Sequence, residues 1–178
     1  MSMPPRIRKL ILTLHVISSV GWLGAVASFL VLGITAVTSE NLPLVRAVYL
    51  AMELMGRFVL VPLSVVSLVT GVIQSLGTKW GLLRHYWIVA KLFINVVASV
   101  ILLLYMQTLT YLSGVAAQPT WSDADISILR TPSTILHSSA GLVLLLIATI
   151  LSVYKPRGIT PYGWRKQHEE RAALPKKA

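Results

Sequence analysis

The chain has 178 residues, of which 55% are hydrophobic and 12% are charged, and it carries a net charge of +10. This balance lies outside the range of soluble globular domains and indicates a membrane protein. The sequence contains no cysteine, which excludes disulfides, thiolate metal sites, iron–sulfur clusters and a cysteine nucleophile. The length is that of one domain, residues 1–178.

Four stretches are long and apolar enough to cross a membrane as helices. They cover about residues 10–37, 58–76, 87–112 and 134–154, and none holds more than one charged side chain. Crossing ~30 Å of hydrocarbon takes about 20 residues of helix. We therefore predict an all-α fold, a polytopic membrane four-helix bundle with up-down-up-down topology.

The first apolar stretch follows Arg6, Arg8 and Lys9, an order that also occurs in secretory signal peptides. It is about twice as long as the apolar core of such a peptide, and Ala36-Val37-Thr38 is a poor cleavage site. We therefore interpret it as a retained helix that starts near Ile7 and ends near Thr38.

Residues 44–55 precede the second apolar stretch and show apolar residues at helical spacing, so they form either an interfacial helix or an outward extension of the second helix. Glu53 and Arg57 are four positions apart, and we expect a surface ion pair between them. Pro62 removes a backbone donor and should bend the helix. A short basic loop then joins the second and third helices as a hairpin.

The segment 113–132 is expected to be the longest external loop. The fourth helix ends at Tyr154, because Lys155-Pro156-Arg157-Gly158 stops it. Residues 155–178 form a basic tail that we expect to be partly helical, from Trp164 to Ala173.

Positive charge is distributed unevenly over the expected loops. If the N-terminus is cytoplasmic, 13 of the 16 Lys and Arg residues lie on the cytoplasmic side. The positive-inside bias therefore predicts that both termini are cytoplasmic. Topology and attraction to anionic lipid at that face account for the basic rim, so we expect the lipid bilayer as a partner and no nucleic acid.

Small residues recur at four-residue spacing in the first helix, Gly21 with Ala25 and Gly24 with Ser28. The fourth helix begins with Ser138-Ser139-Ala140-Gly141. Small residues let membrane helices approach closely. These faces serve either packing inside the bundle or association with a second copy or a partner subunit.

Ionisable side chains inside hydrocarbon are costly and mark candidate functional sites. The apolar stretches hold His15, Lys91 and His137. At ~1.5 Å per residue, His15 and Lys91 both lie about 8 Å inside the cytoplasmic ends of their helices, so they can share one layer. His137 enters from the opposite face and should lie more than about 10 Å from that layer.

The histidines leave several chemistries open. An imidazole can ligate haem iron or another metal, exchange a proton, or bond to a neighbouring helix, for His15 through Ser18, Ser19 or Asn95. Lys91 either belongs to a site or extends to the inner headgroups. The roles of His85 and His137 stay open.

The stretch Leu14-His15-Val16-Ile17-Ser18-Ser19-Val20-Gly21-Trp22-Leu23-Gly24 resembles the first helix of a group of bacterial four-helix membrane proteins. The group includes the copper-resistance D type, the haem-containing protoporphyrinogen oxidases and several uncharacterised predicted membrane families. They share a Leu-His pair followed seven residues after the His by Trp and then a small residue. Trp87-Ile88-Val89-Ala90-Lys91-Leu92 likewise resembles their Trp and Lys pattern. The resemblance implies a bacterial cytoplasmic membrane as the location.

In the oxidases, the equivalent His and Lys are associated with haem binding and activity. The resemblance therefore implies a cofactor site of His15, Trp22 and Lys91, in which His15 is the axial metal ligand of haem b, Trp22 packs on the cofactor and Lys91 pairs with a carboxylate. The oxidases have a Tyr-His pair where this chain has Ala36-Val37-Thr38, so we expect its nearest relatives among the uncharacterised families.

Two functions follow as hypotheses. The first is a membrane protein that binds b-type haem or another tetrapyrrole for redox chemistry or electron transfer. The second is a non-enzymatic membrane subunit or small permease linked to metal handling.

Overall fold

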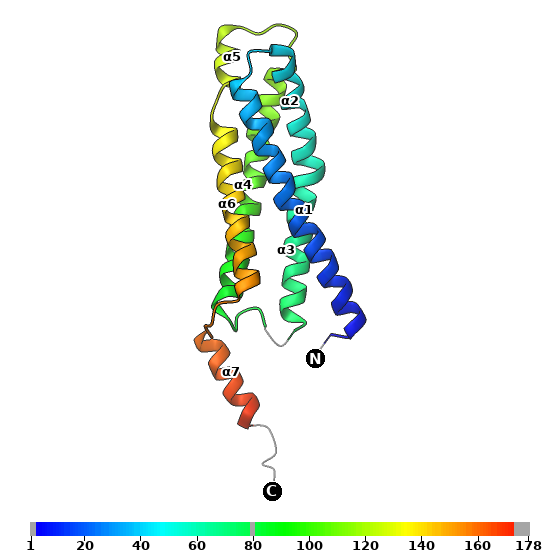
Figure 1. The fold of residues 1–178 in the computed structure, drawn as a ribbon, viewed down its shortest axis with the longest axis vertical. Helices are drawn as coiled ribbons and strands as arrows, with labels where there is room; N and C mark the ends of the chain where they lie inside the picture. Colours follow the sequence, from blue (N-terminus) through cyan, green and yellow to red (C-terminus); the bar gives the residue numbers. More distant parts are fainter. Residues whose placement is uncertain (1–2, 79–80, 173–178) are drawn as a thin grey trace.

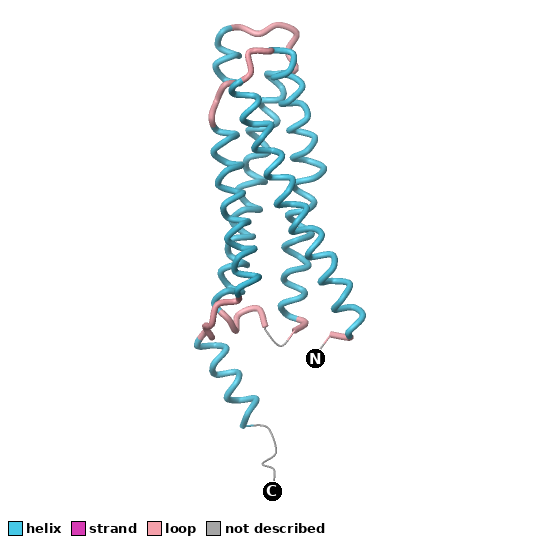
Figure 2. The backbone as a smooth tube through the Cα atoms, viewed as in Figure 1, coloured by secondary structure: helices cyan, strands magenta, loops and turns pink. Residues whose placement is uncertain are grey.

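The computed structural model describes residues 3–78 and 81–172, which form an elongated bundle of four long helical rods (Figure 1). The elements are α1 (Pro5–Thr38), α2 (Leu42–Met55), η1 (Gly56–Leu60), α3 (Val61–Leu76), α4 (Tyr86–Ala116), α5 (Asp123–Leu129), α6 (Ser133–Tyr154) and α7 (Pro161–Ala172). Short loops join these helices (Figure 2). The predicted all-α class is confirmed.

Four spans in the described part of the chain are long and apolar enough to cross a membrane: Pro5–Thr38, Leu42–Leu76, Tyr86–Ala116 and Asp123–Tyr154. The outer faces of the rods are apolar, with Phe58 and Phe93 each 68% exposed and Leu104 63% exposed. In water such a surface would be a large apolar patch, whereas lipid solvates it without cost. The chain is therefore an integral membrane protein, and the four predicted spans are confirmed.

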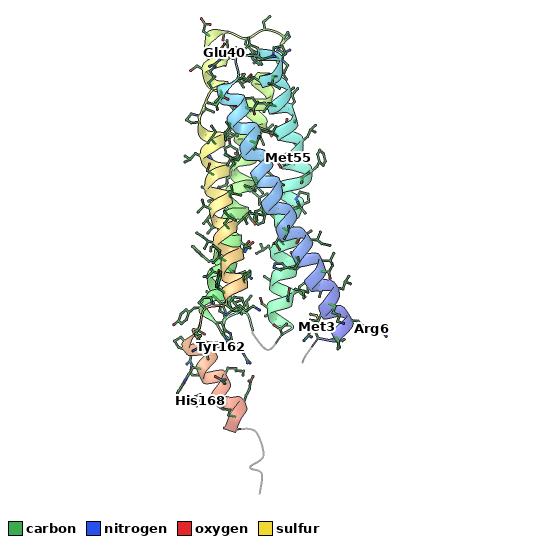
Figure 3. The ribbon with its side chains drawn as sticks, in the orientation of Figure 1. Met3, Arg6, Glu40, Met55, Tyr162 and His168 are labelled. Atoms are coloured by element: carbon green, nitrogen blue, oxygen red, sulfur yellow. The ribbon has the colours of Figure 1, made fainter. Side chains whose placement is uncertain are left out.

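The rods alternate in direction, so the N-terminus and α7 lie at one end of the bundle (Figure 1). We call this the terminal end and the opposite end, which carries α5 and residues 39–41, the loop end. Arg6 lies at the terminal end and Glu40 at the loop end (Figure 3). Both α1 and α4 contact α2, α3 and α6, which places α1 and α4 at opposite corners of the bundle.

The second rod is one continuous helix with a wide turn in its middle. Residues 44–55 belong to α2, so they extend the second helix rather than forming a separate interfacial helix. In the π-helical turn η1 the N–H of Val61 donates to the carbonyl of Gly56. Pro62 follows this turn directly. In a regular α-helix the proline ring would clash with the carbonyl of the residue four positions earlier, and the wider π-helical turn relieves that clash.

The segment expected as a long loop, 113–132, is largely helical, so that expectation was wrong. α4 continues to Ala116, and α5 covers Asp123–Leu129. Ser122 and Asp125 form a capping box at the start of α5: the Ser122 side chain accepts the N–H of Asp125, and the Asp125 carboxylate accepts the N–H of Ser122. This spacing of Ser and an acid is a helix-start signal that was present in the sequence.

The expected helix in the tail is confirmed as α7, which begins at Pro161. Ala173, the expected last residue, lies outside the described residues, as do Lys79, Lys176 and Lys177 of the basic rim.

The small-residue faces of α1 have different surroundings. A Cβ on Gly21 would lie 3.4 Å from Leu63 of α3, and Ala25 is buried, so this face packs inside the bundle. A Cβ on Gly24 would meet no described atom within 4 Å. Internal packing therefore explains the Gly21 face, and the Gly24 face is open to lipid.

The tightest packing is in the loop-end half. Tyr49 and Met52 have no exposed surface, and Leu109 and Leu129 are each 1% exposed. The hydroxyl of Tyr49 donates to the carbonyl of Leu129, which ties α2 to the end of α5.

Candidate functional site

His15 is held by α3 in the terminal-end half of the bundle. Its Nδ1 lies 3.1 Å from the carbonyl oxygen of Ser67 and 3.2 Å from the hydroxyl of Thr70. A Cβ on Gly71 would lie 3.0 Å from the Cε1 atom of His15, so the ring rests against the helix backbone. Because a carbonyl only accepts, Nδ1 carries the proton and Nε2 has a free lone pair when the ring is neutral.

The partners proposed for His15 from the sequence were wrong. The hydroxyls of Ser18 and Ser19 donate to the backbone carbonyl of His15, not to its ring. The side-chain amide of Asn95 donates to the carbonyl of Lys91 at 2.8 Å. The ring does bond to a neighbouring helix, as one of the alternatives proposed, but that helix is α3.

Lys91 lies across the bundle on α4, at the same terminal end. Its Nζ is 5.4 Å from the ring centroid of Trp87, a cation–π distance. It is also close enough to His15 for the two groups to interact electrostatically. The pair therefore shares a region, which we call the His15–Lys91 layer.

A row of small polar residues on α3 completes this layer. Ser64, Ser67 and Thr70 are all buried and recur every three residues, so they share one helix face. Farther along α3, Gln74 buries its Oε1 atom without a hydrogen bond partner among the described residues. This row was not identified from the sequence, although the sequence contained a signal for it: Ser and Thr residues at helical spacing within an apolar stretch.

A cavity of about 320 Å³ lies farther toward the loop end, between α1, η1, α4 and α6. Neither His15 nor Lys91 belongs to its lining, which consists of Trp22, Val26, Phe29, Gly56, Leu60, Ala98, Ile101, Leu102, Tyr105, Met106, Leu109, Leu136, His137, Ser138, Ala140, Gly141 and Leu144. Along α4 the lining extends from Ala98 to Leu109, about 16 Å at the helical rise. The cavity is therefore elongated along the helices.

The cavity reaches the lipid-facing surface between α4 and α6. Leu136 and Ile101 both line it, and they are 67% and 43% exposed on the outside of the bundle. Small residues on the same two helices, Ala98, Ala140 and Gly141, make the space.

Four residues of the lining have polar side-chain atoms, and one of them, Ser138, donates its hydroxyl to the carbonyl of Thr134 at 2.6 Å. Trp22 is 2% exposed, and its Nε1 has no hydrogen bond acceptor among the described residues. The ring of His137 stacks on Tyr105 with centroids 4.3 Å apart, and its Nδ1 donates to the carbonyl of Ser133 at 2.8 Å. The Tyr105 hydroxyl donates to Thr134 at 3.0 Å. Trp22 is therefore the donor that the surrounding protein leaves unused.

The structure separates the residues that the sequence grouped together. Trp22 lies seven positions beyond His15 on α1, about 10 Å along the axis, and it faces the cavity. His137 stacks on Tyr105, about 21 Å along α4 from Lys91. The expected distance between His137 and the His15–Lys91 layer is confirmed.

The polar groups at the loop end act as structural links. Glu53 accepts hydrogen bonds from Arg57 at 2.9 Å, from Thr110 at 3.2 Å and from Ser113, so the expected ion pair is confirmed and extended to α4. Arg46 donates to the carbonyls of Ala116, at 2.9 Å, and Gln118, at 2.5 Å.

At the terminal end, α7 is attached to the connection between α3 and α4. The hydroxyl of Thr160 donates to the carbonyl of Leu83 at 2.6 Å, and Arg84 forms an ion pair with Glu170 at 2.5 Å. This hydrogen-bonded pair lowers the pKa of Glu170. Gly163 is required here because a Cβ would lie 2.4 Å from the carbonyl oxygen of Arg84.

Within residues 3–78 and 81–172, no three His, Asp or Glu side chains converge as metal ligands. Comparison of the chain with protein-family models, with curated proteins and with solved structures found no match.

Proposed function

We propose that this membrane protein binds a single-chain lipid or a lipid-like molecule, which enters the bundle from the bilayer between α4 and α6. The observation that supports the proposal is the long apolar cavity with a lateral opening at Leu136 and Ile101. Its length of about 16 Å along α4 suits a hydrocarbon chain running parallel to the helices.

The size of the cavity argues that it is filled. At about 24 cal/mol per Å³, an empty apolar space of 320 Å³ would cost roughly 8 kcal/mol. That cost is comparable to the whole stability of a typical domain. A chain drawn from the surrounding lipid makes the missing contacts and removes most of the cost.

A pair of matched substitutions tests the proposal. Gly141→Leu places a side chain in the cavity, whereas Gly24→Leu places the same side chain on a face with no described atom within 4 Å. After purification and delipidation, mass spectrometry of the extract should find a chain-like molecule at about one per wild-type protein. Gly141→Leu should lower its amount at least about tenfold, and Gly24→Leu should leave it unchanged.

Ala98→Leu is a second cavity-filling variant, on α4 instead of α6. If both filled variants retain as much ligand as the wild type, the cavity is not the binding site and the proposal fails.

A second candidate function is the binding of b-type haem through His15. It is favoured by the orientation of the ring, since a histidine that ligates a metal commonly donates its other N–H to a backbone carbonyl, as His15 does to Ser67. Haem would supply one-electron redox chemistry. Nε2 of His15 would hold the iron, and the ammonium of Lys91 would pair with a propionate.

The cavity is not the place for such a group. Its lining lacks both His15 and Lys91. Trp22 faces the cavity and is therefore not part of this second candidate.

Absorption spectroscopy of protein from haem-replete cells tests the second candidate. A Soret band is expected that disappears in His15→Ala and persists in His137→Ala. Absence of the band in the wild type would rule it out. If neither a chain nor haem is retained, a non-enzymatic subunit or a small permease linked to metal handling is the remaining hypothesis.

We also propose a bacterial cytoplasmic membrane with both termini inside the cell. The proposal is supported by basic residues at helix ends that lie at the terminal end: Arg6, Arg8 and Lys9 at the start of α1, Arg84 before α4, and Lys155 and Arg157 after α6. A reporter fused after Ala178 should be active in the cytoplasm. Activity in the periplasm would contradict this orientation.

A further inference from the structure

The indole N–H of Trp22 is a donor without an acceptor in the interior of a membrane protein. Its ring is 2% exposed and lines the cavity, and Nε1 has no hydrogen bond partner among the described residues. A buried donor left unpaired is unfavourable, and most buried polar groups in proteins have a partner.

We propose that the cavity ligand carries a carbonyl group, and that its oxygen accepts the hydrogen bond of Trp22. This inference rests on the proposed function, because it names the chemistry of the molecule that occupies the cavity. An indole only donates, so the complementary group must be an acceptor. A carboxylate at this depth would need a cation, whereas a neutral ester or ketone oxygen does not.

The position of the donor sets the direction of the ligand. A Cβ on Gly141 of α6 would lie 3.8 Å from Val26 of α1, and one on Gly33 would lie 3.1 Å from Thr134. These two contacts define the antiparallel register of α1 and α6, in which His137 is level with about residue 30 of α1. Trp22 therefore lies about 12 Å farther from the loop end than His137 does. One small polar group cannot reach both side chains.

The ligand therefore places its carbonyl at Trp22, and its chain extends past Tyr105 and His137 toward the opening at Leu136. Trp22 is a specificity-determining residue in this arrangement, because it distinguishes a carbonyl chain from a plain hydrocarbon of equal size.

Two probes of matched length test the inference: methyl laurate, a linear ester, and pentadecane, a hydrocarbon with the same number of heavy atoms. Their affinities are measured by competition against a spin-labelled methyl stearate on protein in lipid nanodiscs. The wild type should prefer the ester at least about fivefold, which is the effect of one net hydrogen bond. Trp22→Phe keeps an aromatic ring but removes the N–H, and it should reduce the preference to about one.

Trp121→Phe is the matched control. Trp121 also buries an Nε1 without a partner among the described residues, but it does not line the cavity. The control should keep the wild-type preference for the ester.

The outcomes separate this inference from the proposed function. If ester and hydrocarbon bind equally well to the wild type, the carbonyl assignment is overturned while chain binding stands. If neither competes, chain binding itself fails.

A third probe, a decyl-substituted para-benzoquinone, identifies the source of the carbonyl. If the quinone binds more tightly than the ester, and Trp22→Phe removes that difference, the ligand is a quinone. If the quinone binds more weakly than the ester, the ligand is an acyl ester.

Discussion

The two halves of this bundle are built from the same kind of helices but differ in what lies between them. The loop-end half is tightly packed around Tyr49, Met52 and Leu109 and contains one long apolar cavity. The terminal-end half has few large buried side chains and holds polar groups instead, the His15–Lys91 layer with its row of small polar residues on α3. Stability therefore resides mainly in the loop-end half, and the polar groups of the other half need a different explanation.

Removing one tyrosine side chain from each half should give the largest difference in the free energy of unfolding. Tyr49 has no exposed surface and bonds to Leu129, whereas Tyr86 at the terminal end is 58% exposed. Tyr49→Ala should lower the free energy of unfolding by about 3–5 kcal/mol, and Tyr86→Ala by about 0.5 kcal/mol or less. Unfolding in detergent, followed by circular dichroism, measures both values. Equal losses would show that the two halves are equally well packed.

Removing one charged group from each half should destabilise the protein in the loop-end half only. Glu53 is bonded to Arg57, Thr110 and Ser113, so Glu53→Leu leaves several polar groups without their acceptor and should cost about 1–3 kcal/mol. Lys91 forms no ion pair with a described residue, and Lys91→Leu replaces a charge within a membrane-spanning helix by a hydrocarbon. The second variant should be as stable as the wild type or more stable. A clear loss in Lys91→Leu would mean that Lys91 is a structural residue.

The smallest effect concerns the attachment of α7. The hydrogen-bonded Arg84 lowers the pKa of Glu170, so the contact contributes at neutral pH and is lost in acid, as the pH falls through that lowered pKa and the carboxylate takes up a proton. Because the chain lacks cysteine, a spin label at Gln167→Cys reports specifically on α7. The label should become more mobile in acid.

In the Glu170→Gln variant the label should already be mobile at neutral pH. Glu169→Gln, which removes only a contact with Lys166 inside α7, should behave as the wild type. A label that is equally mobile in both variants would show that Arg84 does not hold the helix.

The sequence was sufficient for the elements whose signal is local. Length and apolarity predicted the four spans, and the spacing of Glu53 and Arg57 predicted their ion pair. The partner of His15 was not predictable, because Ser67 offers a backbone carbonyl, and every residue has one. The cavity is lined by small residues of two helices, Ala98 of α4 and Ala140 and Gly141 of α6, and no single stretch of sequence shows which small residues will share a cavity. For the same reason Trp22 was grouped with His15, with which it shares a helix, rather than with His137, with which it shares the cavity.

Electron paramagnetic resonance of a spin-labelled methyl ester chain in nanodiscs tests most directly whether the loop-end half holds a ligand. The wild type should show an immobilised component of about one chain per protein beside the mobile lipid signal, and Gly141→Leu should remove that component while Gly24→Leu keeps it. A spectrum with mobile lipid alone in the wild type, or an immobilised component that survives Gly141→Leu, would contradict the account.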